Sequence, residues 1–301
     1  MIERILVPLD GTIFAEHALP YAISLAKHSG AALSLTMVEV PPPMAFPDLS
    51  FLEPLTEAEV GYLDSVADRV REAGIADVSP QVIKGNVPEA LEEHRRKIGA
   101  DLTVMATHGR GPMARSWLGS VADHFARSTA APVLMVRPDH ANDEVELTGL
   151  PSVSEILVTL DGSALSESAL EPALELARLY GARATLVRLV EYPNRTESVY
   201  LPDAVEAIEE RLEESRAAAH DELERIATRL RTDGGSPVDL ETRVVVHAAE
   251  GILDVAGERE ADLIAIASHG RGGLRRLVLG SVADKVLRGS PIPVLIVRAE
   301  A

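Results

Sequence analysis

Short apolar runs alternate with longer stretches of helical periodicity along the whole chain. In the first half, the runs of strand length are Ile5–Leu9, Leu33–Val38, Val78–Ile83, Leu102–Met105 and Val133–Val136. The stretches with apolar residues at helical spacing are Ala15–His28, Thr56–Ala73, Pro88–Lys97 and Gly119–Ser128. Continuously apolar strands joined by helices predict a parallel sheet with helices on both faces, which is an α/β fold.

The second half repeats this order and shares sequence with the first. Glu3–Thr12 reads ERILVPLDGT and Glu155–Ser163 reads EILVTLDGS, while APVLMVR ends the first half and IPVLIVR, at Ile292–Arg298, ends the second. We therefore predict two tandem domains, residues 1–140 and 152–301, joined by a polar linker of residues 141–151. Right-handed crossovers would make each domain doubly wound, with its ligand site at the carboxyl edge of the sheet.

The middle helix differs between the halves. In the second half it is longer and acidic, at about Asp203–Leu230, and charged residues alternate there with apolar positions. We interpret this pattern as a solvated face over a buried stripe, with a coiled-coil contact as the alternative. In the first half, Thr56 followed three residues later by Glu59 predicts a capping box at the start of the helix.

Composition and charge narrow the classes of partner. The chain of 301 residues is 46% hydrophobic, carries a formal net charge of −18 and has a pI of about 4.9. Such an acidic surface repels nucleic acids and anionic lipids, so we expect neither as a partner. There is no cysteine, the opening MIERILVPLDG does not resemble a signal peptide, and no apolar run approaches the length of a membrane span. We expect a cytoplasmic protein.

A glycine-rich turn follows the fourth strand of each half. Ala106–Asp123 reads ATHGRGPMARSWLGSVAD and Ala267–Asp284 reads ASHGRGGLRRLVLGSVAD. Glycine lets a ligand approach the backbone, and a helix N-terminus with a serine hydroxyl favours a phosphate. The nine residues between the first glycine and the Gly-Ser pair leave room for a loop around a polyphosphate. The alternative is an ordinary strand-to-helix loop with a glycine cap.

Two further positions in each half would reach the same edge of the sheet. Asp10 and Asp161 each follow the first strand in a Leu-Asp-Gly turn, where a carboxylate would bind ribose hydroxyls or Mg²⁺. The alternative for these residues is an Asx-turn or a cap for the next helix. Val38 and Val190, near the ends of the second strands, would form a wall of an adenine pocket or belong to the core.

Other catalytic and binding motifs are missing or weak. The sequence contains neither a GxxxxGK[ST] phosphate loop nor a GxSxG nucleophile elbow. The run Gly109–Ala114 fits a GxGxxA dinucleotide pattern, but it follows the fourth strand and contains Pro112. His108 and His269 have no partner at a metal-ligand spacing, so we interpret them as structural or orienting residues. We predict no catalytic residues and no protein metal centre.

The ordered set of motifs resembles the universal stress protein family in its tandem two-domain form. It comprises ILVPLDGT and ILVTLDGS, THGRG…LGS and SHGRG…LGS, and PVLMVR and PVLIVR, and it covers nearly the whole chain. The resemblance implies a Rossmann-like, five-stranded parallel domain of the adenine nucleotide alpha hydrolase-like kind. In the ATP-binding subgroup, a Gly-x2-Gly-x9-Gly-[Ser/Thr] loop holds the nucleotide.

Carried over residue by residue, the resemblance implies two nucleotide sites. The phosphate-binding positions would be Gly109, Gly111, Gly119 and Ser120 in one half and Gly270, Gly272, Gly280 and Ser281 in the other. Asp10 and Asp161 would lie at the ribose or at Mg²⁺, and Val38 and Val190 at the adenine.

The chain also departs from the family motif. Its first glycine is alanine in both halves, at Ala106 and Ala267. Pro112 removes a loop N–H donor in the first half, whereas the turn after the third strand carries Gly85 in the first half and aligns with Ala248 in the second. On loop chemistry the second site is favoured.

The resemblance also implies how the domains associate and what the protein does. Val133–Val136 and Val294–Val297 would pair antiparallel within the chain as a pseudo-dimer, and further association into a homodimer through the acidic helix stays open. The expected function is binding of ATP, with or without Mg²⁺, by a regulatory stress protein. A nucleotide-free stress scaffold and a slow ATPase or autophosphorylating enzyme are the alternatives.

Overall fold

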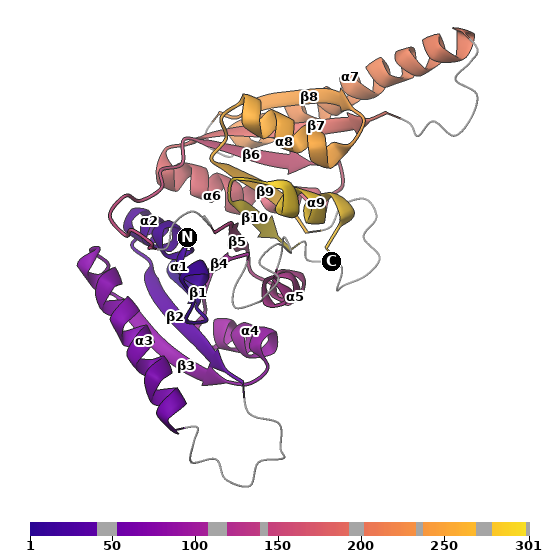
Figure 1. The fold of residues 1–301 in the computed structure, drawn as a ribbon. Coiled ribbons are helices and arrows are strands. Elements are labelled where there is room, and N and C mark those ends of the chain that lie inside the picture. The colour runs from indigo at the N-terminus through magenta and orange to yellow at the C-terminus, as the bar shows by residue number, and fades with distance from the viewer. Residues whose placement is uncertain are drawn as a thin grey trace, which may run out of the picture. The chain divides into compact units, whose positions relative to one another are not determined.

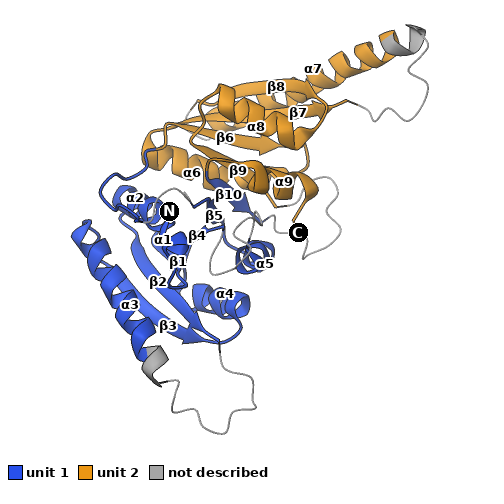
Figure 2. Cartoon of the chain, in the orientation of Figure 1, with its two compact units in different colours: residues 1–152, 293–298 blue, residues 153–292, 299–301 orange. Residues whose placement is uncertain are grey.

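The computed structural model describes most of the chain and divides it into two compact units (Figure 1). The described residues are 1–40, 53–107, 119–138, 144–192, 202–232, 237–268 and 279–298, with only the backbone of 53–56 and 202–205. Unit 1 contains residues 1–152 and 293–298, and unit 2 contains residues 153–292 (Figure 2). Among all the described residues, every helix is too short or too polar to span a bilayer.

Unit 1 is built on a sheet with the strand order β3-β2-β1-β4-β5-β10. Its strands are β1 (Arg4–Pro8), β2 (Ala32–Glu39), β3 (Val78–Lys84), β4 (Leu102–Ala106), β5 (Val133–Val136) and β10 (Val294–Val297). All pairings from β3 to β5 are parallel, as the apolar runs predict. Ile5, Leu6 and Val7 of β1 have no exposed surface, because this strand lies inside the sheet and is covered on both faces.

Helices cover both faces of this sheet, which makes unit 1 doubly wound. They are α1 (Ile13–Glu16), α2 (Leu19–Ser29), α3 (Glu53–Glu72), α4 (Val87–Ile98) and α5 (Ser120–Ser128). Helices α2 and α3 lie on one side of the strands, and α4 and α5 pack together on the other (Figure 1). The chain therefore reverses its direction across the sheet between β1 and β4, as in other doubly wound folds.

Two helix boundaries differ from the sequence prediction. The single helix predicted at Ala15–His28 is divided into α1 and α2, because Pro20 at the start of α2 has no N–H to continue the α1 ladder. Helix α3 begins at Glu53, so Thr56 lies inside the helix and the predicted cap at this residue is wrong. Pro54 is tolerated there because a first helical turn needs no N–H donor.

Unit 2 repeats the arrangement with the strand order β9-β6-β7-β8. Its elements are β6 (Glu155–Leu160), η2 (Ser166–Ala169), α6 (Leu170–Tyr180), β7 (Arg183–Glu191), α7 (Pro202–Thr232), β8 (Asp239–Val245), α8 (Ala248–Glu258), β9 (Leu263–Ala267) and α9 (Ser281–Gly289). All three pairings are parallel. Leu212, Leu223 and Ile226 of α7 are buried, while the charged residues of this helix are mostly exposed. This favours the interpretation of α7 as a helix with one buried apolar stripe and one solvated face.

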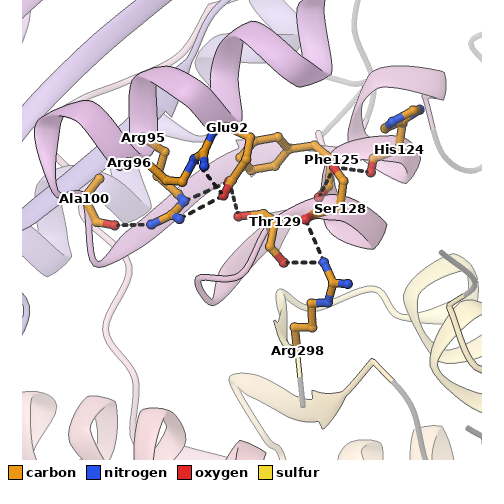
Figure 3. Close-up of polar contacts among 9 residues, drawn as sticks. All are labelled: Glu92, Arg95, Arg96, Ala100, His124, Phe125, Ser128, Thr129 and Arg298. Carbon is orange, nitrogen blue, oxygen red and sulfur yellow. Dashed lines mark hydrogen bonds and ion pairs between the residues drawn. The ribbon is translucent and has the colours of Figure 1, made fainter. Parts of the chain in front are cut away.

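The last strand of the second repeat belongs to unit 1. Strand β10 pairs antiparallel with β5, with Leu295 opposite Leu134, which confirms the pairing predicted from the sequence. Arg298 at the end of β10 donates a hydrogen bond of 2.7 Å to the carbonyl of Ser128 and a longer one, 3.5 Å, to that of Thr129 (Figure 3). A cation at these carbonyls complements the negative end of the α5 dipole.

Residues 144–152, which we call the inter-repeat strap, lie on unit 1. Val145 and Leu147 bury their side chains although the strap has no helix or strand. The hydroxyl of Ser24 on α2 donates to the carbonyl of Pro151 over 2.7 Å, and the guanidinium of Arg69 on α3 donates to the carbonyl of Val145 over 3.3 Å. The described part of the predicted linker is therefore attached to the first unit.

Candidate functional site

The candidate site of each unit lies where the strand order reverses. In unit 1 the reversal separates β1 from its neighbour β4, and in unit 2 it separates β6 from β9. Loops that leave the carboxyl ends of two such strands run to opposite faces of the sheet, and the crevice between them is where doubly wound folds bind ligands. The Asp-Gly turn and the start of the helix after the fourth strand both lie at this edge.

Asp10 holds a tight turn at the end of β1. Its Oδ1 accepts the backbone N–H of Thr12 over 3.0 Å and the Thr12 hydroxyl over 2.6 Å, while Gly11 adopts a positive φ of 79°. The same hydroxyl accepts the N–H of Ala15 over 3.4 Å and caps α1. This is the Asx-turn and cap that the sequence offered as the alternative to a ligand role.

Asp161 repeats this geometry at the end of β6. Its Oδ1 accepts the N–H of Ser163 over 2.9 Å and the Ser163 hydroxyl over 2.6 Å, and Gly162 has a φ of 80°. The Ser163 hydroxyl then accepts the N–H of Ser166 at the start of η2 over 3.1 Å. Both units therefore present a half-buried carboxylate in the same fixed turn at the reversal point.

The helices that follow β4 and β9 begin next to the strand ends. The N–H of Gly119 donates to the carbonyl of Thr107 over 2.7 Å, and the N–H of Gly280 donates to that of Ser268 over the same distance. Each glycine is the N-cap of its helix and leaves the first turn without a side-chain cap. The amide groups of a first helical turn have no intrahelical acceptor, so α5 and α9 each present N–H donors at this edge.

The serines of the two Gly-Ser pairs are the first residues of these helices. Ser120 opens α5 and Ser281 opens α9, and both are exposed. The other predicted phosphate-binding glycines, Gly109, Gly111, Gly270 and Gly272, lie outside the described residues, as do His108, Pro112 and His269.

The valines predicted at the adenine lie at corresponding strand ends. Val38 pairs with Ile83 of β3 and Val190 pairs with Val244 of β8. Both valines are partly exposed, so they belong to the surface of the carboxyl edge and not to the closed core. Within the described residues, no group of three or more His, Asp or Glu side chains is arranged to hold a metal ion.

The structure corrects the predicted correspondence of Gly85 with Ala248. Asn86 and His247 are the N-caps of α4 and α8, so the residue that corresponds to Gly85 is Val246 and not Ala248. Gly85 has a φ of 150°, a conformation that residues with a side chain rarely adopt, whereas Val246 has 71% of its surface exposed. The contrast of Gly85 with Ala248 therefore gives no reason to rank the two sites.

Ion pairs beneath the two Asp-Gly turns were not foreseen from the sequence. In unit 1, Glu16 at the end of α1 is buried and accepts hydrogen bonds from Tyr62 and Arg69 of α3. Burial raises the pKa of Tyr62, and the carboxylates of Glu16 and Asp10 raise it further, so the turn and this pair share one electrostatic environment. No spacing in the sequence joins helices α1 and α3, so only the folded chain reveals the contact.

In unit 2 the pair that corresponds to Glu16 and Arg69 is formed by Glu167 and Arg229. A buried arginine lies next to the Asp-Gly turn in addition to this pair. Arg188 of β7 has 7% of its surface exposed and pairs with Glu222 of α7 at 3.8 Å. Its guanidinium lies so close to the turn that a Cβ on Gly162 would be 2.5 Å from one of its nitrogens. The two turns therefore have different charged groups behind them.

Comparison with known proteins identifies a family and several relatives. The family model described as the universal stress protein family matches residues 1–137 and 153–298. A universal stress protein of Mycobacterium tuberculosis is 32% identical over 200 residues, which are 66% of this chain and 62% of that protein. One from Mycolicibacterium smegmatis is 26% identical over 98% of this chain and 96% of its own length.

A solved structure shares the fold. The crystal structure of a universal stress protein from Archaeoglobus fulgidus superposes with a TM-score of 0.73 at 20% identity and covers 98% of both chains. At this identity the likeness concerns the α/β architecture alone.

Proposed function

Because the chain belongs to the universal stress protein family, we propose that it binds ATP or a related adenine nucleotide and acts as a regulatory protein in a stress response. Binding rather than turnover is the activity. The nucleotide would bind at the carboxyl edge of each sheet and change the order of the loops there, and with it the choice of protein partner.

One observation carries the proposal. In both units, a helix whose first turn has no side-chain cap begins beside an Asp-Gly turn on the neighbouring strand. Free N–H groups at a helix N-terminus attract a phosphate, and a carboxylate nearby suits ribose hydroxyls or a phosphate-bound Mg²⁺. The phosphates and the ribose of a nucleotide would thus be bound by groups that follow two adjacent strands.

The proposed roles follow the family motif. The phosphates would contact the backbone of Gly119 and Ser120 in unit 1 and of Gly280 and Ser281 in unit 2, together with the glycines of the two loops that precede them. Asp10 and Asp161 would bind the ribose or Mg²⁺ through carboxylate oxygens that also hold their turns. Val38 and Val190 would contact the adenine.

The wider proposal concerns the whole chain. We place it in the cytoplasm as a protein of two domains, residues 1–140 and 152–301, that binds neither nucleic acid nor membrane. Its net charge of −18 disfavours polyanionic surfaces, so a nucleotide would have to be held by local N–H donors.

The test is isothermal titration of the full chain with ATP. A Gly280→Val variant places a branched side chain where the phosphates would approach the backbone, and we expect it to abolish the binding heat of one site. The φ of Gly280 is −57°, which valine adopts without backbone strain, so a loss of binding would not result from such strain. Gly119→Val is the counterpart in unit 1.

A matched control is Gly257→Val, at an exposed position of α8 where an added Cβ meets nothing within 4 Å. It should bind ATP like the wild type. Equal affinity of Gly280→Val, Gly119→Val and the wild type would refute the assigned sites. Purified protein that binds no adenylate in native mass spectrometry would favour the nucleotide-free scaffold, and steady phosphate release would favour the slow ATPase.

A further inference from the structure

Glu16 is a buried carboxylate at the end of the one-turn helix α1. The side chain is 7% exposed, and its two oxygens are held from the same neighbouring helix. The hydroxyl of Tyr62 donates to Oε1 over 3.0 Å, and a guanidinium nitrogen of Arg69 donates to Oε2 over 2.7 Å. A buried carboxylate bound by a cation and a hydroxyl fixes the end of the element that carries it.

The two ends of α1 are therefore held by different parts of unit 1. At its start, the Thr12 hydroxyl caps the helix and is bonded to Oδ1 of Asp10. At its end, Glu16 is bonded to α3. Only three residues lie between Thr12 and Glu16, so we expect a shift of Glu16 to change the cap or the Asp10 turn.

Arg69 connects helix α1 to the inter-repeat strap. Its second terminal nitrogen donates to the carbonyl of Val145 over 3.3 Å, so one planar guanidinium bonds α1 and the strap at once. The strap is held at two further points, by the buried side chain of Leu147 and by the bond from Ser24 to Pro151. Release of the strap would remove one of the two acceptors that orient the guanidinium.

The second repeat provides an internal comparison. Glu167 of η2 corresponds to Glu16, and Arg229 of α7 donates to it over 2.6 Å in the place of Arg69. This pair is more exposed, with 33% of the Glu167 side chain and 53% of the Arg229 side chain accessible. Among the described residues, the bond to Glu167 is the one hydrogen bond of the Arg229 side chain.

We propose that Arg69 is a positioning residue for the first nucleotide site and makes its affinity depend on the docking of the inter-repeat strap. The inference rests on the proposed nucleotide binding and adds its regulation. The docked strap orients Arg69, Arg69 holds Glu16, and α1 then holds the Asp10 turn in the form that receives the ligand. By linkage, nucleotide at this site stabilises the docked strap to the same extent. Whatever releases the segment between the repeats weakens the first site and spares the second.

The experiment is hydrogen exchange of the full chain, measured by mass spectrometry at increasing ATP concentration. Peptides that contain residues 10–16 and 161–167 report the two sites separately, and a peptide that contains residues 144–152 reports the strap. In the wild type, ATP should slow exchange in all three peptides. The strap should respond with the same midpoint as residues 10–16.

Three substitutions, two of which are also combined, distinguish a positioning role of Arg69 from a general effect on stability. Arg69→Lys keeps the positive charge for Glu16 but has no planar fork to hold two acceptors, and Leu147→Asp undocks the strap without touching Arg69. Each should raise the ATP midpoint of residues 10–16 about 5- to 150-fold, the usual range of coupling between sites, and leave residues 161–167 unchanged. The double variant should be no weaker than the stronger single one, because both break one pathway. Arg229→Lys is the matched control and should leave the strap and residues 10–16 at the wild-type midpoint.

The outcomes distinguish this inference from the proposed function. If ATP protects residues 10–16 in the wild type but leaves the strap unchanged, the nucleotide site stands and the coupling is refuted. The coupling is also refuted if Arg69→Lys, which retains the fold most readily, keeps the wild-type midpoint. If ATP protects neither residues 10–16 nor residues 161–167, the proposed function fails and the inference falls with it.

Discussion

Replacing Glu92 with glutamine removes the charge at the centre of a polar network between α4 and α5 (Figure 3). The carboxylate accepts two hydrogen bonds from Arg95, at 2.8 and 2.9 Å, and one from the Thr129 hydroxyl at 2.7 Å. Arg95 in turn donates to the carbonyl of Ala100 over 3.0 Å. Glutamine has nearly the same shape but accepts through one atom, so one donor of Arg95 loses its partner.

The size of the effect follows from how far the pair is removed from water. The side chains of Glu92 and Arg95 are 17% and 11% exposed. Breaking one partner of a fully buried pair costs about 3–5 kcal/mol, and an exposed pair contributes about 0–1 kcal/mol. For this mostly buried pair, with one acceptor retained, we expect a loss of about 2 kcal/mol, or roughly 4–8 °C in Tm.

The assay is urea unfolding at pH 7, followed by circular dichroism, with Glu213→Gln as the control. Glu213 and Arg216 form the same two-bond pair at the same spacing, at 3.0 and 2.6 Å, on the exposed face of α7. Solvent screens that pair, so its loss should not change the unfolding curve. Equal behaviour of the two variants would refute the argument that burial gives the Glu92 pair its stabilising effect.

The same network gives a pH signature. Burial by itself raises the pKa of Glu92, but hydrogen bonds from Arg95 and Thr129 outweigh it and hold the pKa below 4.5. A carboxyl whose pKa is lower in the folded state stabilises fully above pH 4.5, and this contribution is lost as the pH falls through the folded value. The difference between wild type and Glu92→Gln should therefore narrow below pH 4.5. A difference that widens in acid would contradict this sign.

Three further substitutions test other parts of the fold. Gly162→Ala should destabilise unit 2 by at least about 1 kcal/mol more than Gly181→Ala, measured by urea unfolding, because both have a positive φ but only Gly162 faces the Arg188 guanidinium. Burial, with repulsion from a nearby lysine, lowers the pKa of His94 below 6.5. The unfolded chain therefore takes up a proton first, so the stability of the fold decreases as the pH drops below 6.5. His94→Val should remove this part of the decrease of Tm in acid. Arg298→Met keeps the aliphatic stem but loses the hydrogen bond to the α5 carbonyl and should cost about 1 kcal/mol, detectable as faster hydrogen exchange in β10.

Much of the fold could be predicted from the sequence because its signals are local. The apolar runs at Ile5–Leu9 and Leu33–Val38 lie in buried parallel strands, and the repeated ends APVLMVR and IPVLIVR contain the strands that pair. Helix ends were less certain, because competing signals lie a few residues apart. Thr56 carried a cap signal, but the helix starts three residues earlier at Glu53.

The turns and helix starts at the predicted site residues could be anticipated from the sequence, but the contacts around them could not. The Asp-Gly turns and the helix starts at Ser120 and Ser281 lie where the motifs place them. The chain alone could not choose between a turn and a ligand role for Asp10, because one carboxylate suits both. The bond from Arg69 to Glu16 and the strap could not be found either, since aperiodic segments and contacts between distant helices leave no pattern in a sequence.

The insertion of β10 beside β5 has a consequence for synthesis of the protein. Val133 pairs with Ile296, which the ribosome adds only after it has translated most of the second repeat. Until then the nascent amino-terminal half carries an open strand edge that another nascent chain can occupy. A gene cut between the repeats would leave that edge open permanently, so the one-repeat product should self-associate, whereas the two-repeat chain pairs β5 with its own β10.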